Sequence, residues 1–163
     1  MKHVWLLRHA KSSWDDPTLA DHERPLAPRG HRAAIRIGRW AADNDVRPLL
    51  VLCSTAVRAR ATLDLVLPGL GDPAVEVEPS LYHASAMELI ERLQALPVGI
   101  ESVLFVGHNP GLHDLACALA PPGPEAFPTG ALAELELAIE AWEDGRPGCA
   151  RLRAVVVPRS LPG

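Results

Sequence analysis

The sequence predicts a single α/β domain over residues 1–163, with three α/β/α layers and a mainly parallel sheet covered by helices on both faces. Short apolar runs typical of buried strands lie at His3–Leu7, Leu49–Cys53 and Ser102–Val106. Segments with helical spacing of apolar residues separate these runs, and strands that alternate with helices form parallel sheets joined by right-handed crossovers. The length of 163 residues suits one hydrophobic core.

The helices are predicted from apolar residues that recur at steps of three and four. In residues 30–44, Ala33, Ile37 and Ala41 follow this spacing, while the arginines fall on other faces. The same pattern predicts helices at 55–67, 85–96 and 109–120. In the last of these, Asn109 is the expected N-cap, with Pro110 at the first helical position.

Two further strands are predicted near the C-terminus, at 132–137 and 151–157. We expect them to form an antiparallel addition to the edge of the sheet. Clusters of Pro and Gly at 121–130 and 145–148 predict loops.

Composition excludes several classes of function. Sixteen Lys and Arg residues against 20 Asp and Glu give a net charge of −4, so the basic surface typical of nucleic-acid-binding proteins is absent. The N-terminal segment has no apolar run long enough for a signal-peptide core or a membrane span, so we expect a cytoplasmic protein with no membrane partner. Cys53, Cys117 and Cys149 are odd in number and widely spaced, as expected for reduced thiols.

Basic side chains follow the predicted strands at the points where they end. Arg8 and His9 follow the first strand, Arg58 lies early in the helix after the second, and His108 lies between the strand at 102–106 and its helix. Because parallel strands bind ligands at their carboxyl ends, these four side chains are expected on one rim. Ser54 is the expected N-cap of the helix that carries Arg58, and a helix N-terminus favours an anion.

Two arginines and two histidines around one pocket suit a phosphoryl group. The forked guanidinium groups of arginine stabilise the negative charge on the phosphoryl oxygens during transfer. A neutral imidazole nitrogen can attack phosphorus in line. No Asp, His and Glu cluster has metal-ligand spacing, and His108 and His113, five residues apart, do not share a helical face. We therefore expect neither a metal nor another cofactor. His3, His31 and His113 have no motif support and are interpreted as surface or core residues.

Three motifs resemble the histidine phosphatase superfamily, in the branch that includes the phosphoglycerate mutases. LLRHAKSSW resembles the R-H-G signature, STAVRARAT resembles the S-x-x-x-R-A-x-x-T element, and VGHNPG resembles the segment of the second catalytic histidine. With DHERPLAPRG at 21–30, their order and the chain length resemble the short SixA-like phosphohistidine phosphatases.

The resemblance implies a phosphoglycerate mutase-like fold and a role for each matched residue. His9 is then the nucleophile that carries the phosphoryl group, Arg8 and Arg58 bind the phosphate, and His108 completes the pocket. Arg24, in DHERPLAPRG, is a further candidate for the phosphate pocket. Ala10 stands where the motif has glycine, which matters only if the backbone there needs a positive φ.

A carboxylic acid is missing from the segment where larger members of the superfamily place one. That segment, PSLYHAS, contains Tyr82 and His83 instead. The imidazole of a phosphohistidine is a better leaving group than an alkoxide, so the missing acid favours phosphohistidine on a protein over a small phosphate ester. Side chains that could fold into the pocket and serve as the acid are Asp15, Asp16, Glu23, His83 and Glu88.

Two alternatives to a protein phosphohistidine phosphatase remain open. One is a phosphomonoesterase or mutase acting on a small phosphorylated substrate, and the other is a pseudoenzyme that only binds phosphorylated partners. A cysteine phosphatase is disfavoured, because its loop requires C-x5-R, whereas CSTAVR places only four residues between Cys53 and Arg58.

Overall fold

The computed structural model describes residues 1–163 and confirms the predicted α/β class with a sheet of six strands. The strand order is β3-β2-β4-β1-β5-β6. The strands β1, β2, β3 and β4 run parallel, β5 pairs antiparallel with β1, and β6 pairs antiparallel with β5. Their bounds are β1 Lys2–Arg8, β2 Leu50–Ser54, β3 Ala74–Glu78, β4 Ser102–Gly107, β5 Leu132–Leu137 and β6 Ala150–Val156.

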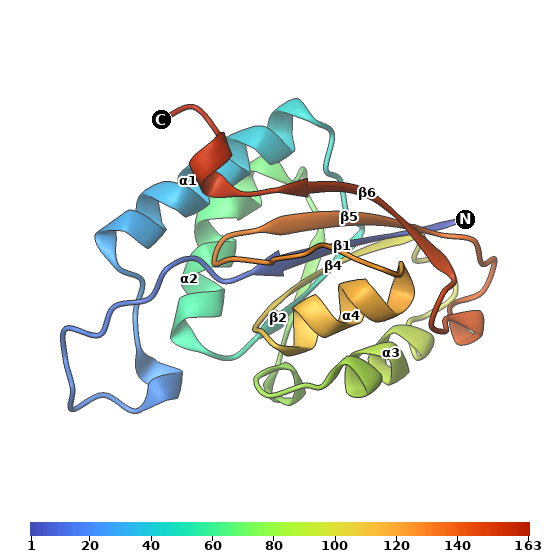
Figure 1. Cartoon of the computed structure of the whole chain (residues 1–163), viewed down its shortest axis with the longest axis horizontal. Helices are drawn as coiled ribbons and strands as arrows, with labels where there is room; N and C mark the ends of the chain where they lie inside the picture. The colour runs from blue at the N-terminus through green and yellow to red at the C-terminus, as the bar shows by residue number, and fades with distance from the viewer.

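Four α-helices cover the two faces of this sheet (Figure 1). The first two, α1 (Pro28–Asp43) and α2 (Val57–Val66), lie on one face. The other two, α3 (Ala86–Gln94) and α4 (Gly111–Leu119), lie on the opposite face. Short 3-10 turns connect the elements, among them η1 (Asp21–Glu23), η3 (Pro79–Leu81) and η5 (Pro158–Ser160).

The apolar strand residues build two hydrophobic cores, one on each face. In β1, Val4 and Leu6 pack with α3 and α4, while Trp5 and Leu7 pack with α1 and α2. Successive side chains of a strand point to opposite faces, so a strand buried on both sides reads as a continuous apolar run. This burial explains why the central strands were recognisable in the sequence.

The predicted edge addition is confirmed, and one strand was missed. Residues 132–137 and 150–156 form the antiparallel strands β5 and β6. The missed strand is β3, whose sequence AVEVE is mostly exposed at the opposite edge. Its short alternation of apolar and acidic residues lacks the apolar run used to predict the other parallel strands.

Two predicted helix starts differ from the structure. The helix α4 begins at Gly111 with Pro110 at the N-cap position, not at Pro110 with Asn109 as cap. The Asn109 side-chain amide donates to Phe127 O, and its Oδ1 accepts at 3.2 Å from the N–H of His113 in the first turn of α4. Ser54 is the last residue of β2, and α2 begins at Val57 after Ala56.

No helix in the structure has the length and apolar character needed to cross a membrane.

Candidate active site

A cleft of about 430 Å³ opens where the parallel strands end. Arg58 and His108 line it together with Tyr82, His83 and residues at the start of α4. The ring of His9 lies beside it, with its centroid 5.2 Å from that of His108. The sequence-predicted residues from β1, α2 and the end of β4 therefore meet at one end of the sheet.

Close backbone contact fixes one wall of this cleft. A Cβ on Gly111 would lie 2.1 Å from Ala84 O, so only glycine lets α4 start this close to the segment that carries Tyr82 and His83.

The imidazole of His9 is buried, and its tautomer follows from its surroundings. Its Nδ1 lies 2.8 Å from Ala10 O, a carbonyl that can only accept, so Nδ1 carries the hydrogen and Nε2 keeps its lone pair. Burial is the main cause that lowers the pKa of His9 to about 4, and the charges of Arg58 and Arg8 act in the same direction. His9 is therefore neutral at neutral pH.

The Thr62 hydroxyl fixes the backbone next to His9. Ala10 N–H donates to Thr62 Oγ1 at 2.9 Å, and the Thr62 hydroxyl donates to Arg58 O at 2.7 Å. Ala10 is fully buried, and Asp45 is the one non-glycine residue with positive φ in the chain. Alanine therefore carries no backbone penalty where the motif has glycine.

The imidazole of His108 is oriented by the hydroxyl of Ser54. Ser54 Oγ accepts from the Ala56 N–H at 3.2 Å and lies 2.8 Å from His108 Nε2. Because Ser54 is fully buried and His108 Nε2 is the only acceptor within reach of its hydroxyl, we infer that the hydroxyl donates to Nε2, which puts the hydrogen of His108 on Nδ1, a buried atom without a partner. Burial, followed by the charges nearby, lowers the pKa of His108 to about 3.

Arg8 extends from the last position of β1. Its Nη1 donates to Phe127 O at 3.2 Å, while its Nε is buried without a partner. Burial, and secondarily the charge of Arg58, lowers the pKa of Arg8. Arg8 Nε and His108 Nδ1 are thus two buried donors without acceptors, each costing about 1–3 kcal/mol until an acceptor is bound.

Asp21 connects three of the surrounding side chains and was not singled out from the sequence. Its Oδ2 accepts from Arg58 Nη2 at 3.0 Å and from the Tyr82 hydroxyl, and its Oδ1 accepts from Arg24 Nη1 at 3.0 Å. The Tyr82 hydrogen bond, together with the two arginines, holds the pKa of Asp21 well below its usual range. Asp21 is therefore ionised and positions Arg58 rather than donating a proton.

Arg24 lies behind Asp21 instead of lining the cleft as expected from its motif. Its guanidinium is buried, donates to Ser12 Oγ and to Ser13 O, and stacks 3.1 Å from the ring centroid of Trp14. Because Nε, Nη1 and Nη2 of Arg24 each donate a hydrogen bond, its guanidinium holds the loop that carries Asp21.

The candidate acids from the sequence are mostly occupied elsewhere. Asp15 is exposed, Asp16 accepts from Thr18, Glu23 contacts His22, and Glu88 forms a capping box with Ser85. His83 is the only one of these candidates that lines the cleft, where its ring lies 3.9 Å from that of Tyr82. Asp114 also lines the cleft, as an exposed side chain in the first turn of α4.

The alternative nucleophile Cys53 does not face the cleft. Its thiol is fully buried and donates to Ser54 O at 3.3 Å, and burial raises the pKa of the thiol to about 12. His113 Nε2 lies 2.8 Å from Pro124 O, a structural contact. No three His, Cys, Asp or Glu side chains are grouped to hold a metal ion.

Comparisons with known proteins agree with this geometry. Residues 4–84 match the histidine phosphatase superfamily (branch 1). The uncharacterized protein Rv1276c of Mycobacterium tuberculosis (strain ATCC 25618 / H37Rv) is 41% identical over 163 residues, covering 94% of this chain and 100% of that protein. Phosphohistidine phosphatase SixA of Escherichia coli (strain K12) is 33% identical over 138 residues, covering 82% of this chain and 84% of that protein.

Similarity to solved structures extends over nearly the whole chain. The structure of the protein histidine phosphatase SixA complexed with tungstate matches with a TM-score of 0.83 and 29% identity, covering 97% of this chain and 98% of that one. The fold is accordingly phosphoglycerate mutase-like. The chain belongs to branch 1 of the histidine phosphatase superfamily and is a phosphatase.

Proposed function

We propose that the protein removes the phosphoryl group from phosphohistidine on a protein, through a phosphohistidine intermediate on its own His9. The observation that carries this proposal is the state of His9: a buried, neutral imidazole whose Nδ1–H is bound to Ala10 O, so that Nε2 alone is free to attack. The proposal also uses the relationship to SixA phosphohistidine phosphatases.

In the first step, His9 Nε2 attacks phosphorus in line, a bond forms between Nε2 and phosphorus, and the bond from phosphorus to the substrate nitrogen breaks. The charge on the phosphoryl oxygens is stabilised by Arg8, Arg58 and the Nδ1–H of His108. Arg8 Nε and His108 Nδ1, buried without partners in the free protein, gain acceptors in this step.

In the second step, a water molecule attacks the phosphorus on His9. The bond between phosphorus and Nε2 breaks, inorganic phosphate leaves, and His9 returns to its neutral form with Nδ1 still bound to Ala10 O. No metal or other cofactor enters either step.

Leaving-group chemistry supports phosphohistidine as the substrate. An ester oxygen needs a proton as it leaves, but Asp21 is held ionised by Tyr82, Arg58 and Arg24. A substrate phosphohistidine whose other ring nitrogen has taken a proton from solvent leaves as neutral imidazole, so the protein need not supply a strong acid. His83 lines the cleft as an exposed side chain, accessible to a leaving group that a partner protein brings to the cleft.

Substrate comparison tests the proposal. We expect kcat/KM on a phosphohistidine-containing protein to exceed that on p-nitrophenyl phosphate and on sugar phosphates, and His9→Ala to abolish all three activities. Higher kcat/KM on the sugar phosphates would instead identify a small-molecule phosphomonoesterase or mutase. Binding of phosphorylated protein without turnover by the parent protein would identify a pseudoenzyme.

A further inference from the structure

A second pocket, outside the catalytic cleft, lies between α1, the segment after β1 and the C-terminal turn η5. It has a volume of about 360 Å³. Its lining residues are Lys11, Arg29, Ala33, Arg36, Pro128, Thr129, Val157, Pro158 and Arg159. None of these lines the catalytic cleft, so the two are separate cavities.

The lining of this pocket is strongly basic and has no counter-charge. It contains four cations and no Asp or Glu, in a chain whose net charge is −4. None of the four side chains makes an ion pair, whereas Arg24, Arg58 and Arg92 elsewhere each pair with a carboxylate. Like charges gathered in a concave site raise its positive potential and attract anions.

Arg36 gives a second, independent sign of a missing ligand. Its Nε is buried and has no hydrogen-bond partner. Arginine presents several donors in a rigid fork that matches an oxyanion, and a buried donor is normally satisfied. The chain itself offers Arg36 Nε no acceptor.

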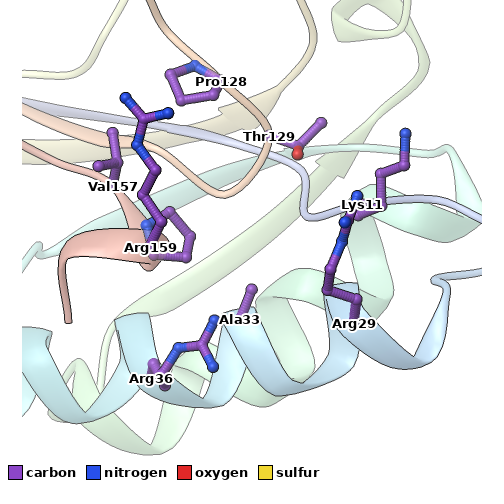
Figure 2. A pocket seen from close by; sticks show the side chains of 9 residues that line it. Lys11, Arg29, Ala33, Arg36, Pro128, Thr129, Val157 and Arg159 are labelled. Atoms are coloured by element: carbon purple, nitrogen blue, oxygen red, sulfur yellow. The ribbon is translucent and has the colours of Figure 1, made fainter. Parts of the chain in front are cut away.

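The cations are distributed over both ends of the pocket, as Figure 2 shows. Lys11 and Arg29 are drawn on one side of the pocket and Arg36 and Arg159 on the other, where the guanidinium of Arg159 points toward Pro128 and that of Arg36 lies beside α1; Thr129 lies across the pocket from α1. A volume of about 360 Å³ falls in the range of small-molecule sites, which is roughly 300–1,000 Å³. This arrangement fits a small molecule with an oxyanion at each end.

The pocket shares structural supports with the catalytic centre. Lys11 follows His9 by two positions, and a Cβ on Gly30 would lie 2.1 Å from Lys11 O, so α1 packs directly on this segment. Gly130 N–H, next to Thr129, donates to the carbonyls of Arg8 and His9. An occupant would thus contact the segments that support His9 without entering the cleft.

We propose that this pocket is a second anion site, which binds a small molecule bearing two oxyanion groups, such as the two phosphoryl groups of a bisphosphate. The site is separate from the phosphoryl site of the catalytic cleft and does not depend on turnover.

Titration calorimetry with inorganic pyrophosphate tests this proposal in a His9→Ala background, where the probe is not consumed. We expect two binding sites. Arg36→Gln and Arg159→Gln should each weaken binding in the second pocket by about tenfold or more, since each removes a charged hydrogen-bond donor. Arg58→Gln should weaken binding in the catalytic cleft instead. Arg159 is exposed in a short turn, so its variant keeps the fold.

The matched control is Arg32→Gln, an exposed arginine on the same helix that lies outside the pocket. It should leave both affinities unchanged. Citrate in place of pyrophosphate distinguishes a carboxylate from a phosphate ligand at the same site. A single site lost only in Arg58→Gln, or equal weakening by Arg32→Gln and Arg36→Gln, would refute the proposal. So would binding of hexaglutamate but not pyrophosphate, which would indicate an acidic protein segment instead.

Discussion

His9 and His108 lie side by side in the cleft, and burial together with adjacent arginines keeps both imidazoles neutral. Neutrality serves two different purposes here. It leaves His9 Nε2 with a lone pair for attack, and it lets His108 sit beside the arginines without adding a further positive charge. Each histidine is oriented by one hydrogen bond: His9 Nδ1–H donates to Ala10 O, and the Ser54 hydroxyl bonds to His108 Nε2.

The low pKa of His9 predicts an acid limb that lies well below the ordinary histidine range. Attack requires neutral His9, so protonation near pH 4 rather than near 6.5 should switch off the nucleophile. The expected result is a titration midpoint of about 4 for the His9 ring signals in NMR spectra of the free protein. A midpoint at or above 6.5 would contradict the environment described for His9.

Asp21→Asn should reduce catalysis by weakening the positioning of Arg58. The charged contacts to Arg58, Arg24 and Tyr82 become neutral, and loss of about 1.5–3 kcal/mol corresponds to roughly a 10- to 150-fold lower kcat/KM. The fall should lie mainly in kcat, since Arg58 acts on the transition state. Asp114→Asn is the control, because Asp114 lines the same cleft without bonding to these side chains. An equal fall in kcat/KM in the two variants would show that Asp21 does not position Arg58.

The helix α2 and the end of strand β1 are joined by Thr62, which accepts from Ala10 N–H and donates to Arg58 O. This one hydroxyl therefore connects, by hydrogen bonds, the segment that carries the nucleophile and the helix that carries Arg58. The pairing explains why a threonine four residues after the arginine belongs to the motif found in the sequence.

Thr62→Val should therefore destabilise the protein and slow the reaction together. Valine keeps the shape but leaves the buried Ala10 N–H without an acceptor, which costs about 1–3 kcal/mol. Urea unfolding measures the first effect and kcat/KM the second. Thr62→Ser keeps the hydroxyl and should restore most of both. If serine is no better than valine, the hydrogen bonds are not what joins these elements.

What the sequence could predict depended on burial and on local motifs. The central strands were recognisable from their apolar runs, and Arg8, His9, Arg58 and His108 from short motifs at or just after the ends of those runs. The exposed edge strand β3 lacks such a run. Asp21 belongs to η1, and its partners Arg58 and Tyr82 are 37 and 61 residues away, so no spacing in the sequence reveals the contact.

The two cores on either side of the sheet hold the strand ends in register, and the polar site is built on top of them. Keeping two imidazoles neutral in this site has a consequence for the stability of the whole protein. Their pKa values in the folded state are about 4 and about 3, below the ordinary value of 6.5 that applies in the unfolded chain.

Stability should therefore fall as the pH drops from about 6.5 towards 3. In this window the unfolded chain takes up protons that the folded protein excludes, so acid favours unfolding. The free energy of unfolding, measured by urea titration at several pH values, should decline less steeply in His9→Asn and in His108→Asn. His31→Asn, at an exposed position on α1, is the control and should keep the parent slope. The same slope in all four proteins would contradict this account.

The central claim is that His9 carries the phosphoryl group, and rapid quenching after mixing with a ³²P-labelled phosphohistidine protein tests it most directly. We predict a labelled phosphoenzyme that is labile to acid, stable to alkali and unaffected by EDTA, with the label mapped to His9 and absent in His9→Ala. A parent protein that turns over substrate without labelling, or that carries the label on Cys53, would contradict the mechanism.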